Sequence, residues 1–319
     1  MGMVGSDPLC TPPTGRCNPM KVSIILPVDH VQNGNEFIGQ DAVIELAGAV
    51  EAAGFDACAV TDHPVPSAAW LDSGGHYAQD PFVMLAMIAA VTRRIRLQTF
   101  LLVLPYRNPF IMARSVASLD ASSGGRVILA VGAGYLKGEF HALGADFARR
   151  NEACDEAIDA MVTAWANDEF SFEGTGYSAR SHRILPRPLQ QPHPPIWVGG
   201  NSKQAIRRAV DKCQGWVPFY APGAAAKNNR TAEMSGVEDY KARLDYLRDY
   251  AREAGRPVPQ DLVAPTFTAW REDSDNQGFR DDFARCADMG ANWAVVTAPG
   301  TTRKAWIDNA NRMADDLRI

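Results

Sequence analysis

The sequence contains no run of about 18 consecutive apolar residues, which is the length that a membrane-spanning helix requires. It also has no cluster of basic residues, and its net charge of −5 at pH 7 argues against a nucleic-acid-binding surface. Its first residues do not combine a positively charged segment with an apolar core, so they do not resemble a signal peptide. These absences predict a cytoplasmic protein that binds neither membranes nor nucleic acids.

The six cysteines show none of the spacings typical of a metal site. Cys10 and Cys17 lie in a leading segment rich in Gly, Pro and Thr, and Cys58 lies in an apolar strand pattern. We therefore expect reduced thiols, no disulfide framework and no bound metal. The sequence also lacks Gly-x-Ser-x-Gly, His-Glu-x-x-His and Walker motifs, so hydrolases and nucleoside triphosphatases have little support.

Eight apolar segments have the character of buried strands, and nearly all of them alternate with amphipathic helices. The segments are 22–27, 55–61, 95–104, 126–131, 196–198, 215–219, 262–269 and 294–297. Alternation of this kind predicts a parallel sheet, and eight units predict a closed (β/α)8 TIM barrel. A doubly wound open sheet is the weaker alternative. We expect residues 1–20 to form a flexible extension and residues 21–319 to form one catalytic barrel domain, with a small hairpin at 169–177.

The segment 194–209 has the pattern of a short strand, a glycine turn and a helix. Gly199 and Gly200 allow unusual backbone dihedrals and the close approach of a ligand. Asn201 or Ser202 can cap the helix that follows. The free N–H groups at such a helix start suit a phosphate. An ordinary connection between a strand and a helix would show the same pattern, so this segment alone does not decide between the two.

In a TIM barrel, the residues that follow the strands line the active-site face. Asp62 and His63 follow the second strand, where a histidine can exchange a proton near neutral pH. Asp62 could polarise His63 or bind a ligand, and a structural Asp–His pair is the alternative. Gly132, Ala133 and Gly134 follow the fourth strand and indicate either a sharp turn or a backbone that lies against a planar ligand.

Several neighbouring residues are weaker candidates. Trp70 and Tyr135 could line a substrate pocket, although a loop tryptophan is as often a packing anchor. Lys137 and Glu139 are interpreted as solvated charges beside the glycine turn. The polar segment 221–236 is interpreted as a candidate lid.

In their order, these segments resemble the luciferase-like family of flavin- and deazaflavin-dependent oxidoreductases, and more narrowly its F420-dependent branch. No single motif is diagnostic, but the ordered set is specific and spans about residues 22–219. The matching segments are Asp62-His63, 97–109 (LQTFLLVLPYRNP), 118–140 (SLDASSGGRVILAVGAGYLKGEF), 192–208 (PHPPIWVGGNSKQAIRR) and Gly215-Trp216.

The resemblance implies a ring cofactor at the C-terminal mouth of the barrel, with its phosphate on the turn at 199–202. It also implies a non-proline cis peptide near Phe100–Leu101, under the ring, and it makes His63 the catalytic residue. Lys203, Arg207 and Arg208 could help to hold an anionic cofactor tail. The implied cofactor-binding residues are Asp62, Phe100, Leu101, Val103, Ala133, Gly134, Gly199, Gly200, Asn201 and Ser202.

One departure limits the resemblance. Tyr135 occupies the position of a catalytic carboxylate in the family's sugar-phosphate dehydrogenases. The interval from His63 to Trp70 is also longer than the interval between the corresponding histidine and tryptophan in those enzymes. Glucose-6-phosphate oxidation is therefore not expected. The resemblance favours hydride transfer between F420 and an unidentified small organic substrate, and it suggests a homodimer. An FMN-dependent monooxygenase and a non-catalytic cofactor-binding barrel are the alternatives.

Overall fold

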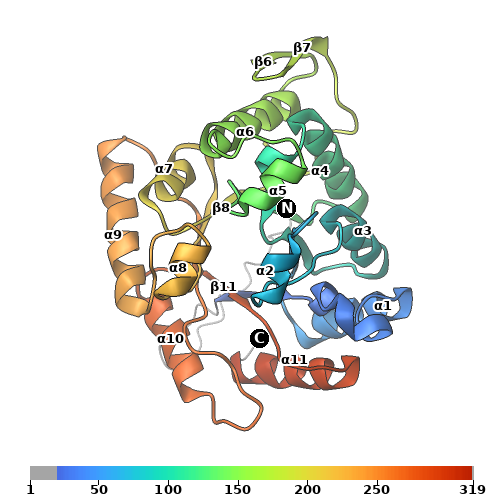
Figure 1. The fold of residues 1–319 in the computed structure, drawn as a ribbon, viewed down its shortest axis with the longest axis vertical. Coiled ribbons are helices and arrows are strands. Elements are labelled where there is room, and N and C mark those ends of the chain that lie inside the picture. The colour runs from blue at the N-terminus through green and yellow to red at the C-terminus, as the bar shows by residue number, and fades with distance from the viewer. Residues whose placement is uncertain (1–19, 318–319) are drawn as a thin grey trace, which may run out of the picture.

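The computed structural model describes residues 20–317, in which parallel strands form a barrel surrounded by helices (Figure 1). Apart from Met20, the expected N-terminal extension lies outside these residues, as do Cys10 and Cys17. The barrel strands are β1 (Lys21–Ile25), β2 (Ala57–Val60), β3 (Arg96–Thr99), β4 (Leu102–Val103), β5 (Val127–Gly132), β8 (Ile196–Gly199), β9 (Gly215–Val217), β10 (Asp261–Ala264) and β11 (Trp293–Val296).

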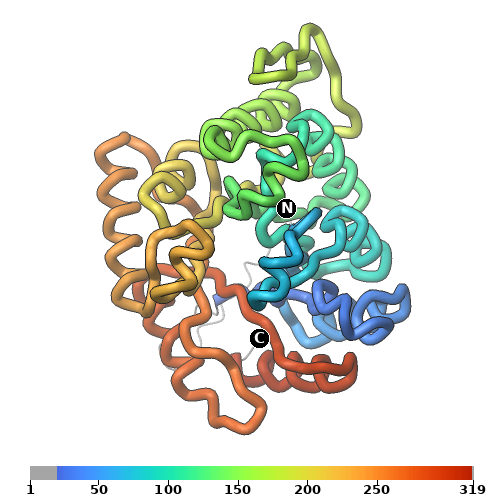
Figure 2. Tube along the Cα trace, viewed as in Figure 1, coloured from blue at the N-terminus to red at the C-terminus, as the bar shows by residue number. Residues whose placement is uncertain are grey.

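The strands pair in the order β3-β2-β1-β11-β10-β9-β8-β5-β4, and pairing of β3 with β5 closes the ring. All of these pairs are parallel. The chain passes once around the barrel, so its first and last strands are neighbours (Figure 2). Because β3 and β4 are two parts of one barrel strand, the predicted (β/α)8 barrel is confirmed.

The third barrel strand is interrupted at a non-proline cis peptide between Phe100 and Leu101, which confirms the prediction for this position. On either side of it, Gln98 pairs with Ile128 and Leu102 pairs with Val131. Four steps along this strand therefore match three steps along β5, which is a β-bulge. The bulge explains why the single segment expected at 95–104 is divided into β3 and β4.

In the part of the chain that the structure describes, eight long helices cover the outside of the barrel. Asp80 and Asn108 cap α3 and α4 through their side chains, and each is followed by a proline at the first helical position. A capping residue followed by proline is a sequence pattern that predicts a helix start. The long helices are α1 (Gln40–Ala53), α3 (Pro81–Val91), α4 (Pro109–Ser123), α6 (Arg150–Ala166), α7 (Lys203–Lys212), α9 (Val237–Glu253), α10 (Gln277–Asp288) and α11 (Arg303–Leu317). No helix among residues 20–317 is both long enough and apolar enough to cross a membrane.

Shorter elements lie in the loops. An antiparallel hairpin stands away from the barrel next to α6 (Figure 1), which confirms the hairpin expected at 169–177 and extends it to His182. The sequence did not indicate the three short helices. The short elements are β6 (Phe170–Gly174), β7 (Tyr177–His182), α2 (Ala68–Asp72), α5 (Lys137–Ala142), α8 (Ala224–Asn228) and the 3-10 turns Pro27–Asp29, Val31–Glu36 and Leu104–Tyr106.

The inside of the barrel is closed at the N-terminal ends of its strands. Trp197 and Trp293 pack edge to face inside the barrel, and both indole N–H groups donate to the carboxylate of Asp261 at 3.0 Å. Buried tryptophans with satisfied N–H groups form a tight floor. A ligand therefore has to enter the barrel from its C-terminal mouth.

Burial makes four thiols unreactive. Among residues 20–317 the cysteines are Cys58, Cys154, Cys213 and Cys286, and all four are free and buried. Loss of hydration raises the pKa of Cys58 to about 12 and that of Cys154 to about 11, and the thiolate is the reactive form.

In a variant with Cys10 and Cys17 replaced by Ser, we expect a thiol-reactive disulfide to label almost nothing at pH 8 before unfolding, and all four thiols after it. Rapid labelling of the folded protein would contradict the buried positions.

Candidate functional site

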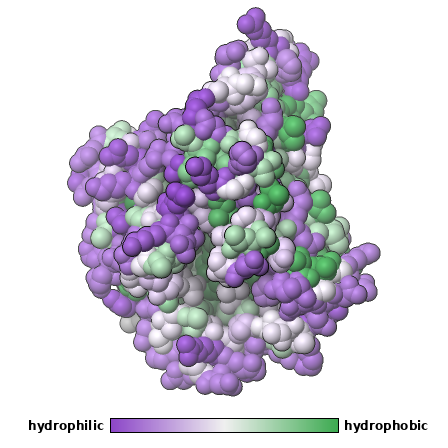
Figure 3. Space-filling view, viewed as in Figure 1, coloured by the Kyte–Doolittle hydropathy of each residue, from purple (hydrophilic) through white to green (hydrophobic). Residues whose placement is uncertain are grey.

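A cavity of about 610 Å³ lies at the C-terminal mouth of the barrel. In the space-filling view, hydrophilic and hydrophobic side chains are mixed around the hollow in the middle of this face (Figure 3). The cavity walls include the residues that follow β2, β3, β5 and β8, as expected for a TIM barrel. Of the candidate residues, those that line the cavity are Asp62, His63, Phe100, Leu101, Val103, Ala133, Gly134, Tyr135, Gly199, Gly200 and Ser202. Asn201 and Trp70 are not among the lining residues.

Two of the lining glycines are required by the bulged strand. A Cβ atom on Gly199 would lie 1.9 Å from Cδ1 of Leu101. Gly134 has a φ of 78°, and a Cβ there would lie 2.6 Å from Cγ1 of Val103. The glycine pattern that suggested a ligand therefore also reflects the close approach of the bulged strand, at Leu101 and Val103, to its neighbours.

The turn after β8 combines a buried anchor with an exposed helix start. Asn201 is completely buried, and its amide donates to the carbonyl oxygens of Phe219 at 2.8 Å and Ala232 at 3.0 Å. Asn201 thus joins the turn to the loop that follows β9. Ser202 caps α7, because its hydroxyl oxygen accepts the N–H of Ala205 at 3.2 Å.

The start of α7 presents backbone N–H groups that can bind a ligand. Ser202, Gln204 and Ala205 line the cavity. Within residues 20–317, the backbone N–H groups of Lys203 and Gln204 have no hydrogen-bond acceptor. Free N–H groups at the positive end of a helix dipole form a suitable site for a phosphate.

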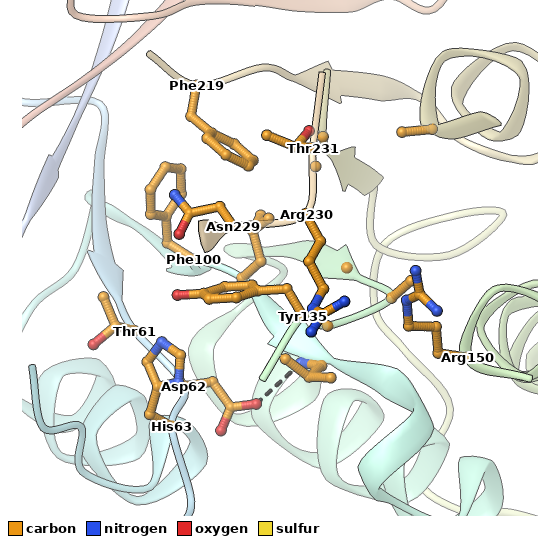
Figure 4. Close-up of a pocket in the computed structure, with 18 of the residues that line it drawn as sticks. Thr61, Asp62, His63, Phe100, Tyr135, Arg150, Phe219, Asn229, Arg230 and Thr231 are labelled. Atoms are coloured by element: carbon orange, nitrogen blue, oxygen red, sulfur yellow. Dashed lines mark hydrogen bonds between the residues drawn. The ribbon is translucent and has the colours of Figure 1, made fainter. Parts of the chain in front are cut away.

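His63 is held in place by a buried carboxylate. Its Nδ1 lies 3.2 Å from Oε2 of Glu139, which also accepts the hydroxyl of Tyr106 at 3.0 Å. Because a carboxylate oxygen accepts, Nδ1 carries the proton and Nε2 is left for a ligand. Trp70 packs against the imidazole with ring centroids 4.6 Å apart. Trp70 therefore supports His63 from behind, and Figure 4 shows His63 beside Thr61 and Asp62 at one side of the cavity.

Glu139 is the main residue that sequence reasoning missed. Its side chain is 1% exposed, so the interpretation as a solvated charge was wrong. It lies in α5, 76 residues from His63, and no local pattern links the two. Tyr135 packs near His63 with ring centroids 6.1 Å apart. Burial, with a smaller contribution from Glu139, raises the pKa of Tyr135 to about 12, so its hydroxyl is a neutral donor at physiological pH.

Asp62 forms a buried ion pair with Arg107. Both carboxylate oxygens accept from the guanidinium at 2.7 Å, and Oδ2 also accepts the N–H of Val103 at 3.0 Å. Figure 4 marks a contact of Asp62 with a dashed line. Asp62 is 4% exposed. Its contacts join the end of β2 to the bulged strand, so its first effect is structural.

The three basic residues expected near a cofactor tail each contact another side chain of the protein. Arg208 lines the cavity but pairs with Asp155, with Nε to Oδ1 at 2.5 Å. Arg207 donates from Nε to the hydroxyl of Tyr246 at 2.8 Å, and the amine of Lys203 lies 5.0 Å from the centroid of the same ring. Of the three, only Arg208 faces the cavity.

The candidate lid at 221–236 lies over one edge of the cavity. An isolated antiparallel bridge between Ala221 and Met234 closes the loop, which contains α8. Its residues 229–231 line the cavity. The loop therefore contributes to the site, and its opening and closing stay a prediction.

Comparison with known proteins gives a consistent result. Residues 20–277 match the family model of the luciferase-like monooxygenases. The chain is similar to an uncharacterized protein of Mycobacterium tuberculosis, with 34% identity over 69% of this chain and 74% of that protein. It is also similar to an FMNH2-dependent dimethylsulfone monooxygenase of Pseudomonas putida, with 31% identity over 54% of this chain and 44% of the enzyme. An F420-dependent glucose-6-phosphate dehydrogenase of Amycolatopsis mediterranei is 24% identical over 86% of each chain.

Solved structures share the fold. A monooxygenase from Streptomyces bottropensis superimposes with a TM-score of 0.74 and 21% identity, over 94% of this chain and 99% of that one. An F420-dependent secondary alcohol dehydrogenase, in complex with an F420–acetone adduct, gives a TM-score of 0.71 and 17% identity, over 95% and 100% of the two chains.

Proposed function

This chain belongs to the luciferase-like monooxygenase family, and within it we propose an oxidoreductase that transfers a hydride between coenzyme F420 and a small organic substrate. The observation that carries the proposal is the position of His63, which Glu139 orients toward the cavity that also contains the start of α7. A group that can exchange a proton and a site for a phosphate thus share one cavity. Hydride transfer to or from an oxygen-bearing carbon needs a proton-exchanging group beside a bound hydride carrier, and F420 is a carrier that can be anchored through its phosphate.

The residues of the cavity fit a ring cofactor that carries a phosphate. The free N–H groups of Lys203 and Gln204 would hold the phosphate. Phe100, Leu101 and the backbone at Gly134 would lie against the ring. F420, when bound, accepts or supplies two electrons as a hydride, and the protein then has to orient the substrate, exclude water and handle a proton.

His63 would handle that proton. With Nδ1 bound to Glu139, Nε2 of a neutral His63 would accept the hydroxyl proton of an alcohol while the hydride leaves the adjacent carbon. In the reverse direction the protonated ring would donate to a carbonyl oxygen. The hydroxyl of Tyr135 would donate a hydrogen bond to the same oxygen, since it remains protonated at neutral pH.

An FMN-dependent monooxygenase is the second candidate. It is supported by the FMNH2-dependent relative, and the start of α7 would suit the phosphate of FMN equally well. Glucose-6-phosphate oxidation is not proposed, because Tyr135 stands in the position where the family's sugar-phosphate dehydrogenases carry a carboxylate.

We also propose that the protein is cytoplasmic and forms a homodimer. The homodimer is supported by exposed apolar side chains on the neighbouring helices α3 and α4, Val83 at 56% and Ile111 at 55%.

The two cofactors can be separated by binding. The purified full chain is titrated with F420, with oxidised FMN and, without oxygen, with reduced FMN, and tryptophan fluorescence is followed. We expect quenching by F420 at micromolar concentrations and much weaker quenching by both forms of FMN. Tight binding of FMN without F420 would support the monooxygenase instead, and binding of none would favour a non-catalytic barrel.

A further inference from the structure

We propose that the outer part of the cavity is a second anion-binding subsite, formed by Arg150 and Arg230, which holds the anionic tail of the cofactor beyond its first phosphate. The proposal rests on the proposed function, because it concerns the same bound cofactor. It adds a requirement to that function, namely that the ligand carries at least two anionic groups.

The two arginines share one aromatic support. Their guanidinium carbons lie 4.2 Å (Arg150) and 5.1 Å (Arg230) from the ring centroid of Phe147. Arg150 also donates from Nη1 to the carbonyl oxygen of Phe147 at 3.0 Å. A cation–π contact orients a guanidinium without neutralising it. Most of the N–H donors of both side chains therefore stay available to a ligand.

No carboxylate neutralises this pair. In the described part of the chain, neither Arg150 nor Arg230 forms a salt bridge. Two other arginines line the cavity or lie beside it, and each has a carboxylate partner: Arg107 pairs with Asp62, and Arg208 pairs with Asp155. Two uncompensated positive charges in one cavity, in a chain of net charge −5, favour an anionic ligand.

A second feature points to the same ligand. Arg150 and Asn151 begin α6, a helix of 17 residues, and they line the cavity together with Ser202 and Gln204 at the start of α7. The positive ends of two helix dipoles therefore meet one space. The start of α7 accounts for one phosphate, and the start of α6 with its two arginines is left for another anion. FMN has a single phosphate, whereas F420 has a phosphate and an acidic tail.

The loop that carries Arg230 is tied to the glycine turn. The N–H of Asn201 donates to the hydroxyl oxygen of Thr231 at 3.1 Å, and its amide donates to the carbonyl oxygen of Ala232 at 3.0 Å. These bonds fix Arg230 relative to the first phosphate position. Figure 4 shows Arg230 reaching from this loop into the cavity near Tyr135, with Arg150 at the far side.

The test compares two ligands that differ only beyond the phosphate. The full chain is titrated with F420 and with the 5′-phosphate of its ring precursor, which has the deazaflavin ring, the ribityl chain and the phosphate but no acidic tail. We expect Arg150→Gln and Arg230→Gln each to weaken F420 binding about 10- to 100-fold, because each loses charge-assisted hydrogen bonds. The same variants should change the affinity for the tail-less ligand less than about twofold. Arg230→Lys should restore part of the loss.

Arg207→Gln is the matched control, since Arg207 lies on α7, contacts Tyr246 and does not line the cavity. It should leave both affinities unchanged. Unchanged F420 affinity in both cavity variants would overturn the subsite, and so would equal losses for the two ligands, which would indicate a structural role. Equal affinity of the unaltered chain for the two ligands would overturn the assignment to the tail. A chain that binds neither ligand would instead contradict the proposed function.

Discussion

Replacing His63 with Gln should lower turnover by about 10²- to 10⁴-fold and leave the affinity for F420 within about twofold. The imidazole is the group that the proposed function uses to move the substrate's proton, and its Nδ1 is already bound to Glu139 at 3.2 Å. Glutamine keeps a polar side chain of similar reach but cannot exchange a proton near neutral pH. The measurement is steady-state kinetics with a substrate found by screening, together with a fluorescence titration of F420.

Two further variants separate chemistry from structure. His182→Gln changes a histidine on the exposed hairpin and should leave both turnover and binding unchanged. Glu139→Gln keeps a hydrogen-bonding side chain beside His63 but removes the carboxylate, so turnover should fall by less than in His63→Gln. Unchanged turnover in His63→Gln would make His63 a structural residue. If His63→Gln lost F420 affinity by as large a factor as turnover, His63 would instead be a residue that holds the ring.

The parts of the fold that could be predicted depend on local chemistry. Apolar segments alternating with amphipathic helices were enough for the barrel, and Asp80-Pro81 and Asn108-Pro109 marked two helix starts. The cis peptide at Phe100–Leu101 came from the resemblance. The three short helices α2, α5 and α8 could not be predicted, because segments of five or six residues carry too few periods to show an apolar face.

The same limit applies to the site. Asp62, His63 and the glycines could be found because each follows a strand directly, where a barrel has its functional face. Their partners could not be found from the sequence, because Glu139 lies 76 residues from His63 and Arg107 lies 45 residues from Asp62. Contacts over such distances depend on the closed barrel, and no periodicity or spacing in the sequence records them. For this reason Asp62 was expected to bind the cofactor, to polarise His63 or to form a structural pair with it, and its pairing with Arg107 was not expected.

Asp62→Ala should lower the free energy of unfolding by about 3–5 kcal/mol, which is the range for breaking one side of a buried ion pair. The side chains of Asp62 and Arg107 are 2% and 18% exposed, and two bonds of 2.7 Å join them. Without the carboxylate, Arg107 loses its partner in a site with little water, and the N–H of Val103 loses its acceptor. Chemical denaturation followed by circular dichroism measures the difference.

The matched control is Asp168→Ala, since Asp168 pairs with Arg187 at the same distance of 2.7 Å but is 98% exposed. Water and salt screen such a pair, so we expect a loss below about 1 kcal/mol. The double variant Asp62→Ala/Arg107→Met should recover part of the loss, because no unpaired charge remains. If Asp62→Ala instead stays as stable as the unaltered chain and loses only its affinity for F420, then Asp62 acts on the cofactor directly. Stability and affinity, measured on the same variant, therefore decide between an anchor for the bulged strand and a ligand for the ring.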